Sequence, residues 1–333
     1  MSLGRRRFVL LAAGGASVAL FPWLTSRRHA PSLVTRQAWA LGSDVSLSVA
    51  GLNEIAANRA LDAAFAEIET VEQVMSLYRP NSQISVLNRD RRLSDPHPYL
   101  LTVLRAAAET SRASGGAFDI TVQPLWEVCA AANRAGRVPT DAELSAAKAK
   151  IHWQQADITN GDVALREPVE SITLNGIAQG FALDRALAAL QAQGATSALI
   201  DTGEIGSLGT KAKNDPWTAG IQHPREEDAY LAVADLDGRA LATSGDYESS
   251  FSADFARNHI FDPRTGNSPG ELASVTIVAP TGLQADALST AAMVLGKSRT
   301  LDLIRKLPRV DALLVDKAGR VTQTAGFPTS AVS

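Results

Sequence analysis

The irregular succession of helix-like and strand-like patterns is the feature that most constrains the fold of this chain. Residues 44–50 alternate between polar and apolar side chains, which is the period-two pattern of a half-buried strand. Further short runs that predict strands occupy 197–200, 217–222, 231–236, 273–279 and 310–315. Helix-like segments lie among them without regular alternation, and no glycine-rich strand–turn–helix fingerprint occurs. The sequence therefore predicts a single mixed α+β domain and argues against a Rossmann fold.

Five helix-like segments carry recognisable signals. Asn53 can cap a helix in which apolar residues recur at helical spacing. Thr140 and Glu143 have the spacing of a capping box at the start of an alanine-rich helix. The other three predicted helices follow Pro98 as far as Gly115, or occupy 184–193 and 283–295.

Composition and charge exclude several classes of function. The chain has 333 residues and a formal net charge of -3. Five of the 32 Lys and Arg residues lie in residues 1–30, and no acidic residue precedes Asp44. The remainder is therefore more acidic than the whole, which argues against nucleic-acid binding because phosphates require a basic surface. The one cysteine, Cys129, cannot close an internal disulfide or supply a thiolate-rich metal site, and an inert thiol is favoured over a nucleophile.

The first thirty residues have the pattern of an export signal. Three consecutive arginines, Arg5 to Arg7, precede an apolar run over 8–21. This run is shorter than the ~20 apolar residues of a spanning helix, and paired arginines before it are typical of the twin-arginine signal, which exports folded proteins. We expect residues 1–30 to be a signal segment, with an N-terminal membrane anchor as the alternative. Residues 31–333 would then form a functional domain in the periplasm.

A carboxylate and a hydroxyl form a candidate metal site late in the chain. Asp286 and Thr290 are four residues apart in a predicted helix, so their side chains share one face. Hard oxygen ligands suit Mg²⁺, which keeps waters and also binds substrate phosphates. The alternative is that Asp286 only complements the positive end of the helix dipole.

Other segments support the metal interpretation. The segment 171–181 places glycines ahead of a helix, where exposed N–H groups suit a phosphate, and 201–206 directly follows a predicted strand. The segment 259–266 combines an imidazole, a carboxylate, a guanidinium and a hydroxyl, with a tight Asp-Pro turn as its alternative interpretation. Tyr78 or Phe118 could stack on a flat heterocycle, although an isolated aromatic side chain is more often part of a core.

Five short motifs follow one another along the chain. They are Ser-x-Tyr-Arg-Pro-x-Ser from Ser76, Gly-Ala-Phe-Asp-x-Thr from Gly116, Gly-Ile-Ala-x-Gly from Gly176, His-Ile-x-Asp-Pro-Arg-Thr-Gly from His259, and Ala-Asp-Ala-Leu-Ser-Thr-Ala from Ala285. In this order, over residues 41–290, they resemble the ApbE family of FAD:protein FMN transferases. The resemblance implies an ApbE-like fold and transfer of FMN from FAD to a Thr or Ser hydroxyl of an acceptor protein, with release of AMP.

The resemblance also assigns roles to individual residues. It makes the side chains of Asp286 and Thr290 ligands of Mg²⁺, joined by the backbone carbonyl of Gly176. The residues that it places around FAD are Leu41, Tyr78, Ala117, Phe118, Asp119, Thr173, Gln179 and Ile260. Thr173 and Gln179 depart from the family pattern, since some members have Asp and many have Lys at these two positions.

The variant segment Asn-Gly-Ile-Ala-Gln-Gly, on a chain with a twin-arginine-type signal, resembles the NosX-type subgroup that accompanies nitrous-oxide respiration. This resemblance implies that the acceptor is the flavin-bearing membrane regulator of nitrous oxide reductase. The acceptor would then be a membrane-bound protein.

The expected chemistry is an in-line attack of the acceptor hydroxyl on the FMN phosphorus. Mg²⁺ would bridge the pyrophosphate of FAD and neutralise charge on the leaving AMP. His259 is the candidate general base, since an unperturbed imidazole titrates near ~6.5, and Asp262 and Asp246 are alternatives for the same role. Two other functions stay open, a Mg²⁺-dependent FAD pyrophosphatase and a non-catalytic periplasmic FAD-binding protein.

Overall fold

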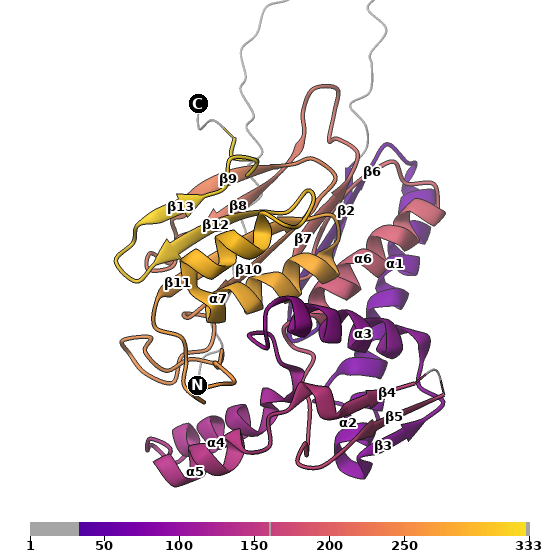
Figure 1. The fold of residues 1–333 in the computed structure, drawn as a ribbon. Helices are drawn as coiled ribbons and strands as arrows, with labels where there is room; N and C mark the ends of the chain where they lie inside the picture. The colour runs from indigo at the N-terminus through magenta and orange to yellow at the C-terminus, as the bar shows by residue number, and fades with distance from the viewer. Residues whose placement is uncertain (1–32, 160, 331–333) are drawn as a thin grey trace, which may run out of the picture.

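An eight-stranded sheet organises the residues that this computed structural model describes, 33–159 and 161–330 (Figure 1). Its strand order is β1-β2-β6-β7-β10-β11-β12-β13, and every neighbouring pair is antiparallel. The strands are β1 (Leu33–Ala40), β2 (Ser43–Ala50), β6 (Ser197–Asp201), β7 (Ile205–Leu208), β10 (Ala240–Gly245), β11 (Leu272–Ala279), β12 (Asp311–Asp316) and β13 (Val321–Gln323). A Rossmann sheet is parallel, so this pairing confirms the predicted α+β class.

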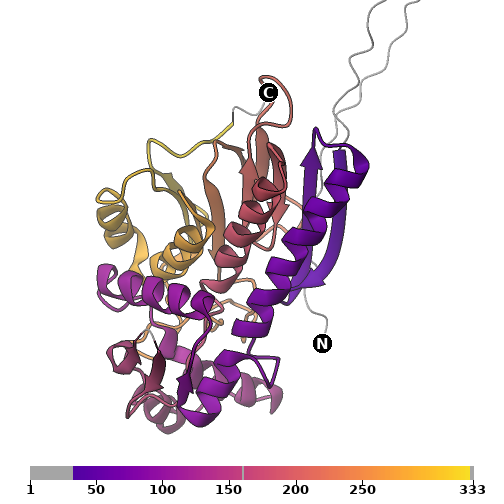
Figure 2. The same cartoon turned by 90° about the vertical axis from the view of Figure 1, so that its right-hand side faces the viewer.

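Three long helices cover one face of the sheet, as Figure 2 shows. They are α1 (Glu54–Met75), α6 (Ala178–Ala192) and α7 (Gly282–Ile304). The first begins as predicted, since the side chain of Asn53 accepts a hydrogen bond from the backbone N–H of Ala56 at 2.9 Å. Its apolar stripe packs in one core cluster with Val45 and Leu47, two alternate residues of β2. Burial of this stripe against the sheet stabilises the helix.

A two-stranded ribbon covers the opposite face of the sheet. It consists of β8 (Trp217–Gln222) and β9 (Tyr230–Leu236), which pair antiparallel. Trp217 and Ile221 form a buried cluster with Leu241 of β10 and Val278 of β11. The middle of the large sheet is therefore enclosed on both faces, which explains why all eight residues of β11 are buried.

The smaller elements lie together at one end of the sheet and its helices (Figure 1). They are α2 (Gln83–Asp90), β3 (Arg92–Ser94), α3 (Pro98–Ala113), the 3-10 turns Ile120–Val122 and Trp153–Gln155, α4 (Gln123–Arg134), α5 (Asp141–Lys148), β4 (Ala156–Ile158) and β5 (Asp162–Leu165). The three short strands form a separate sheet in the order β3-β5-β4. The predicted helix after Pro98 is confirmed, and so is the capping box between Thr140 and Glu143 at the start of α5.

The described residues form a single domain because the core passes from one part to the other. Phe118 and Ile120 of the smaller part share a buried cluster with Ala287 and Ala291 of α7. Within the described residues, no helix is both long and apolar enough to cross a membrane. The predicted signal segment, 1–30, lies outside them.

Two predicted helices have different bounds in the structure. The helix predicted over 184–193 begins six residues earlier, at Ala178, so that Gly180 lies in its first turn. The prediction of a helix over 283–295 is confirmed over its whole length. A second helical segment follows Gly296, where the backbone turns with a φ of 73°. Only glycine adopts this conformation readily, so the kink is encoded by the sequence.

Candidate functional site

Asp286 and Thr290 lie on successive turns of α7, near its N-terminus, as their spacing predicts. Asp286 is only 4% exposed, and its Oδ2 accepts a hydrogen bond from the backbone N–H of Gly180 at 2.9 Å. Thr290 is half-buried. The carboxylate therefore does more than complement its own helix dipole, because it also contacts the start of α6.

Gly176 lies directly against Thr290. A Cβ at residue 176 would come within 2.8 Å of the Thr290 Oγ1, so a side chain at this position would require Thr290 to shift. The three predicted metal ligands are thus brought together from the segment before α6 and from α7. This donor set fits Mg²⁺, which binds proteins through one or two carboxylates together with waters and substrate phosphates. Among the described residues, no group of three His, Cys, Asp or Glu side chains could hold a metal instead.

A chain of hydroxyl groups adjoins the predicted ligands, and the sequence reasoning missed it. Ser244 of β10 places its Oγ 3.4 Å from the Thr290 Oγ1 and 2.7 Å from the Oγ of Ser289. Ser289 in turn donates to the backbone carbonyl of Asp286 at 2.8 Å. One contact of this chain, at 3.4 Å, reaches the Thr290 hydroxyl. The sequence could have indicated Ser244 only if residues 240–245 had been recognised as a strand that lies beside α7.

The glycine-bearing loops meet at the start of α6. The Gln179 side-chain amide donates to the carbonyl of Thr202 at 3.1 Å, and the Thr202 hydroxyl donates to the carbonyl of Gln179 at 3.4 Å. The backbone N–H of Thr173 donates to the carbonyl of Ile120 at 2.7 Å. These bonds join the segment 171–181 to the loop after β6 and to the loop after α3, as a common ligand site requires.

All three residues assigned to FAD on the loop after α3 are buried, and so is Ile260. Ala117 and Ile260 share one core cluster with Leu288 of α7, and Phe118 belongs to the neighbouring cluster. The ring of Phe118 is therefore part of the core, which favours the structural interpretation of this aromatic residue over ligand stacking. Asp119 accepts hydrogen bonds from the N–H and the hydroxyl of Thr121, yet burial raises the pKa of its carboxyl.

Glu72, a residue that sequence reasoning did not single out, joins Leu41 to Arg79, the neighbour of Tyr78 in the sequence. One carboxylate oxygen of Glu72 accepts from the backbone N–H of Leu41 at 3.0 Å. The other accepts from the guanidinium of Arg79 at 2.7 Å, next to Tyr78. The ring of Tyr78 is 77% exposed. Unlike Phe118, it is available to stack on a flat ligand.

The three candidate bases have different surroundings. Asp246 is completely buried between Arg225, which donates to both of its oxygens at 2.7 and 2.8 Å, and Lys317. Asp262 accepts two hydrogen bonds from the guanidinium of Arg264 at 2.8 and 2.7 Å. Burial would raise the pKa of Asp262, but these bonds prevail and lower it, which makes the carboxylate a weaker base. Both carboxylates are therefore held in ion pairs, and His259, which is half-buried, is the strongest candidate.

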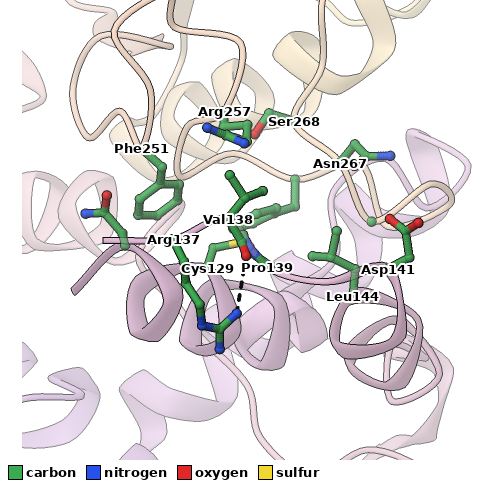
Figure 3. A pocket seen from close by; sticks show the side chains of 13 residues that line it. Cys129, Arg137, Val138, Pro139, Asp141, Leu144, Phe251, Arg257, Asn267 and Ser268 are labelled. Carbon is green, nitrogen blue, oxygen red and sulfur yellow. Dashed lines mark hydrogen bonds between the residues drawn. The ribbon is translucent and has the colours of Figure 1, made fainter. Parts of the chain in front are cut away.

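A cavity of about 260 Å³ lies between the α4–α5 pair and the segment 251–268 (Figure 3). Its lining residues are Cys129, Asn133, Arg137, Val138, Pro139, Asp141, Leu144, Phe251, Arg257, Phe261, Gly266, Asn267 and Ser268. None of these residues is assigned to FAD or to the metal.

Burial raises the pKa of the Cys129 thiol, and the positive charge of Arg257 opposes this rise in part. The thiol therefore stays protonated and unreactive near neutral pH.

The chain is similar to known proteins over most of its length. The chain is 28% identical over 289 residues to the FAD:protein FMN transferase of Salmonella typhimurium, covering 83% of this chain and 82% of that protein. It is 32% identical over 292 residues to the FAD:protein FMN transferase of Treponema pallidum, covering 80% of each.

Solved structures extend the similarity to the fold. The flavin transferase ApbE from Vibrio cholerae superposes with a TM-score of 0.78 at 25% identity, over 89% of this chain and 98% of that one. The ApbE protein from Thermotoga maritima superposes with a TM-score of 0.79 at 27% identity, over 88% and 97%. These matches confirm the predicted ApbE-like fold. Residues 41–314 match the model of the ApbE family, and the chain therefore belongs to that family.

Proposed function

We propose that this chain is a Mg²⁺-dependent FAD:protein FMN transferase that attaches FMN to a Thr or Ser hydroxyl of an acceptor protein and releases AMP. The observation that carries the proposal is the convergence of Gly176, Asp286 and Thr290 where α6 and α7 begin. The transferase activity of the relatives, which match over most of their length, supports the same conclusion.

Each residue of the site has a separate role in the proposed reaction. Mg²⁺, held by Asp286, Thr290 and the carbonyl of Gly176, would neutralise charge on the pyrophosphate when bound. Tyr78, with its exposed ring, would pack against a planar part of FAD. His259 would accept the proton of the acceptor hydroxyl. Gln179, tied to Thr202, would orient the loop after β6 toward the substrate.

The compartment and the acceptor are further parts of the proposal. The arginines at positions 5–7 and the short apolar run after them support export to the periplasm, with the N-terminal segment as signal or anchor. The segment from Asn175 to Gly180 supports the NosX-type subgroup. We propose on this basis that the acceptor is a membrane-associated respiratory protein, the regulator of nitrous oxide reductase.

Incubation with FAD, Mg²⁺ and candidate acceptor domains, read by in-gel flavin fluorescence, tests the proposal. Covalently bound flavin on the acceptor is the expected result. Free FMN and AMP with an unlabelled acceptor would instead identify a pyrophosphatase. FAD that is bound but not consumed would identify a binding protein.

Substitution of His259 is expected to lower the transfer rate ~10²–10⁴-fold with little change in FAD affinity, because a general base acts in the transition state. The measurement is the single-turnover rate against pH for His259→Asn and His259→Ala. Both variants should lose the rise in rate between about pH 5.5 and 7.5 that deprotonation of an imidazole produces in the wild type. An Asn variant with the wild-type rate and pH profile would remove His259 from the mechanism.

Replacement of Arg5, Arg6 and Arg7 by lysine is expected to leave the protein in the cytoplasm, because the exporter of folded proteins reads paired arginines. Cell fractionation measures the periplasmic yield. The control variant replaces Arg27 and Arg28 by lysine, which preserves the charge and leaves the signal pattern intact. An unchanged periplasmic yield for the first variant would refute the twin-arginine assignment.

A further inference from the structure

α6 and α7 cap each other at their N-termini. The carboxylate of Asp286, on α7, accepts from the N–H of Gly180 in the first turn of α6. The carboxylate of Asp184, on α6, accepts from the N–H groups of Gly282 and Leu283 at 2.6 and 2.9 Å, in the first turn of α7. Backbone N–H groups in the first turn of a helix have no partner within the helix. Each helix thus supplies the missing acceptor of the other.

The two helices also touch through their backbones. A Cβ at Gly180 would lie well inside 3.0 Å of the Gly282 carbonyl oxygen, and a Cβ at Gly282 would lie equally close to that of Gly180. No side chain separates the helices at this point. A small shift of α7 against α6 therefore changes the position of Asp286 directly.

The remaining N-terminal groups of α7 are satisfied locally. The Thr281 side chain accepts from the N–H of Gln284 at 3.2 Å, and the Thr281 carbonyl accepts from the N–H of Ala285 at 3.0 Å. Among the described residues, Asp184 alone supplies acceptors from another element to the N–H groups at the start of α7. It is thus the side chain that fixes where α7 begins relative to α6.

We propose that Asp184 is a positioning residue for the metal site. Its carboxylate binds the first turn of α7 and is not one of the assigned metal ligands, and it acts by holding that turn so that Asp286 and Thr290 meet Gly176. This inference rests on one part of the proposed function, the metal site formed by Gly176, Asp286 and Thr290. Loss of a group that orients a metal ligand typically weakens metal binding ~10–100-fold.

The test measures binding of Mn²⁺, which shares the preference of Mg²⁺ for oxygen ligands, to the full chain without FAD. Electron paramagnetic resonance reports the free ion. Asp184→Asn keeps the shape of the side chain and is expected to bind Mn²⁺ ~10–100-fold more weakly than the wild type. Transfer by this variant should recover at saturating metal, because its ligands are intact.

A matched control separates positioning from stability. Asn53→Ala removes a side-chain cap of the same kind at the start of α1, and it should lower the Tm without changing Mn²⁺ affinity. If Asp184→Asn also lowers only the Tm and binds Mn²⁺ as the wild type does, Asp184 is merely a structural cap and the inference is wrong. If Asp184→Asn does not fold, the Mn²⁺ affinity of Asp184→Ser, which retains one acceptor, is measured instead. Wild-type affinity in that variant would likewise overturn the inference.

The outcomes distinguish this inference from the proposed function. A wild type that binds no Mn²⁺ overturns the positioning role and the metal site together. Weaker Mn²⁺ binding by Asp184→Asn in a protein that transfers no flavin would support the positioning role and overturn only the transferase proposal.

Discussion

Asp286→Ala is expected to lower the rate of FMN transfer about 10³-fold or more, because it removes the one charged ligand of Mg²⁺, which contributes several kcal/mol to the transition state. The variant should still fold. The substitution leaves the N–H of Gly180 without this acceptor, which lowers the free energy of unfolding by ~1–3 kcal/mol. That is less than the ~5–15 kcal/mol stability of a typical domain.

Single-turnover transfer at low millimolar Mg²⁺, together with thermal unfolding, measures both quantities for this variant. Asp316→Ala is the matched control, since Asp316 is a carboxylate at the end of β12 that pairs with Arg320. The control should transfer flavin at the wild-type rate. A near-normal rate for Asp286→Ala would overturn the metal assignment.

Gly180→Ala is expected to destabilise the fold by ~3 kcal/mol or more, because the added methyl group collides with the backbone of Gly282 rather than with a side chain that can move. Denaturant unfolding measures the change. In the control variant, Gly270→Ala, the methyl group meets no atom within 4 Å. Its effect should stay within ±0.5 kcal/mol. Equal stability of the two variants would show that the contact between α6 and α7 is loose.

The elements with local signals were predictable from the sequence. The capping residues of α1 and α5 and the alternating pattern of β2 act within a few residues of one another. The start of α6 was not predictable in this way. Glycine is a poor helix former, so local propensity argues against a helix through Gly180, whereas the close contact with Gly282 requires glycine there.

The strands β7 and β10 were missed for a related reason. Both are short, and the sequence of β10 ends in Thr-Ser-Gly, which is weakly strand-like. Their positions in the middle of the sheet depend on neighbours that are distant in the sequence. Ser244 consequently escaped notice, although it lies beside Thr290.

Spacing predicted the shared face of Asp286 and Thr290, because a single helix carries both. It could not predict the state of Asp246. The two cations that hold this carboxylate, Arg225 and Lys317, are 21 and 71 residues away in the sequence. Such partners are visible only in three dimensions, and here they argue against Asp246, one of the two alternatives to His259.

The strand order has a consequence for the timing of folding during synthesis. β2 pairs with β6, so that Ser46 lies opposite Asp201 and Ala50 opposite Ser197. The ribosome adds ~5–20 residues per second, so roughly 7–30 s separate the appearance of these two partners. Through that interval the β1–β2 hairpin presents an open edge, which is a template for pairing with other chains. Nascent chains that end before β6 are therefore a form of this protein exposed to aggregation, and β2 becomes an internal strand of the sheet only when residues 197–201 arrive.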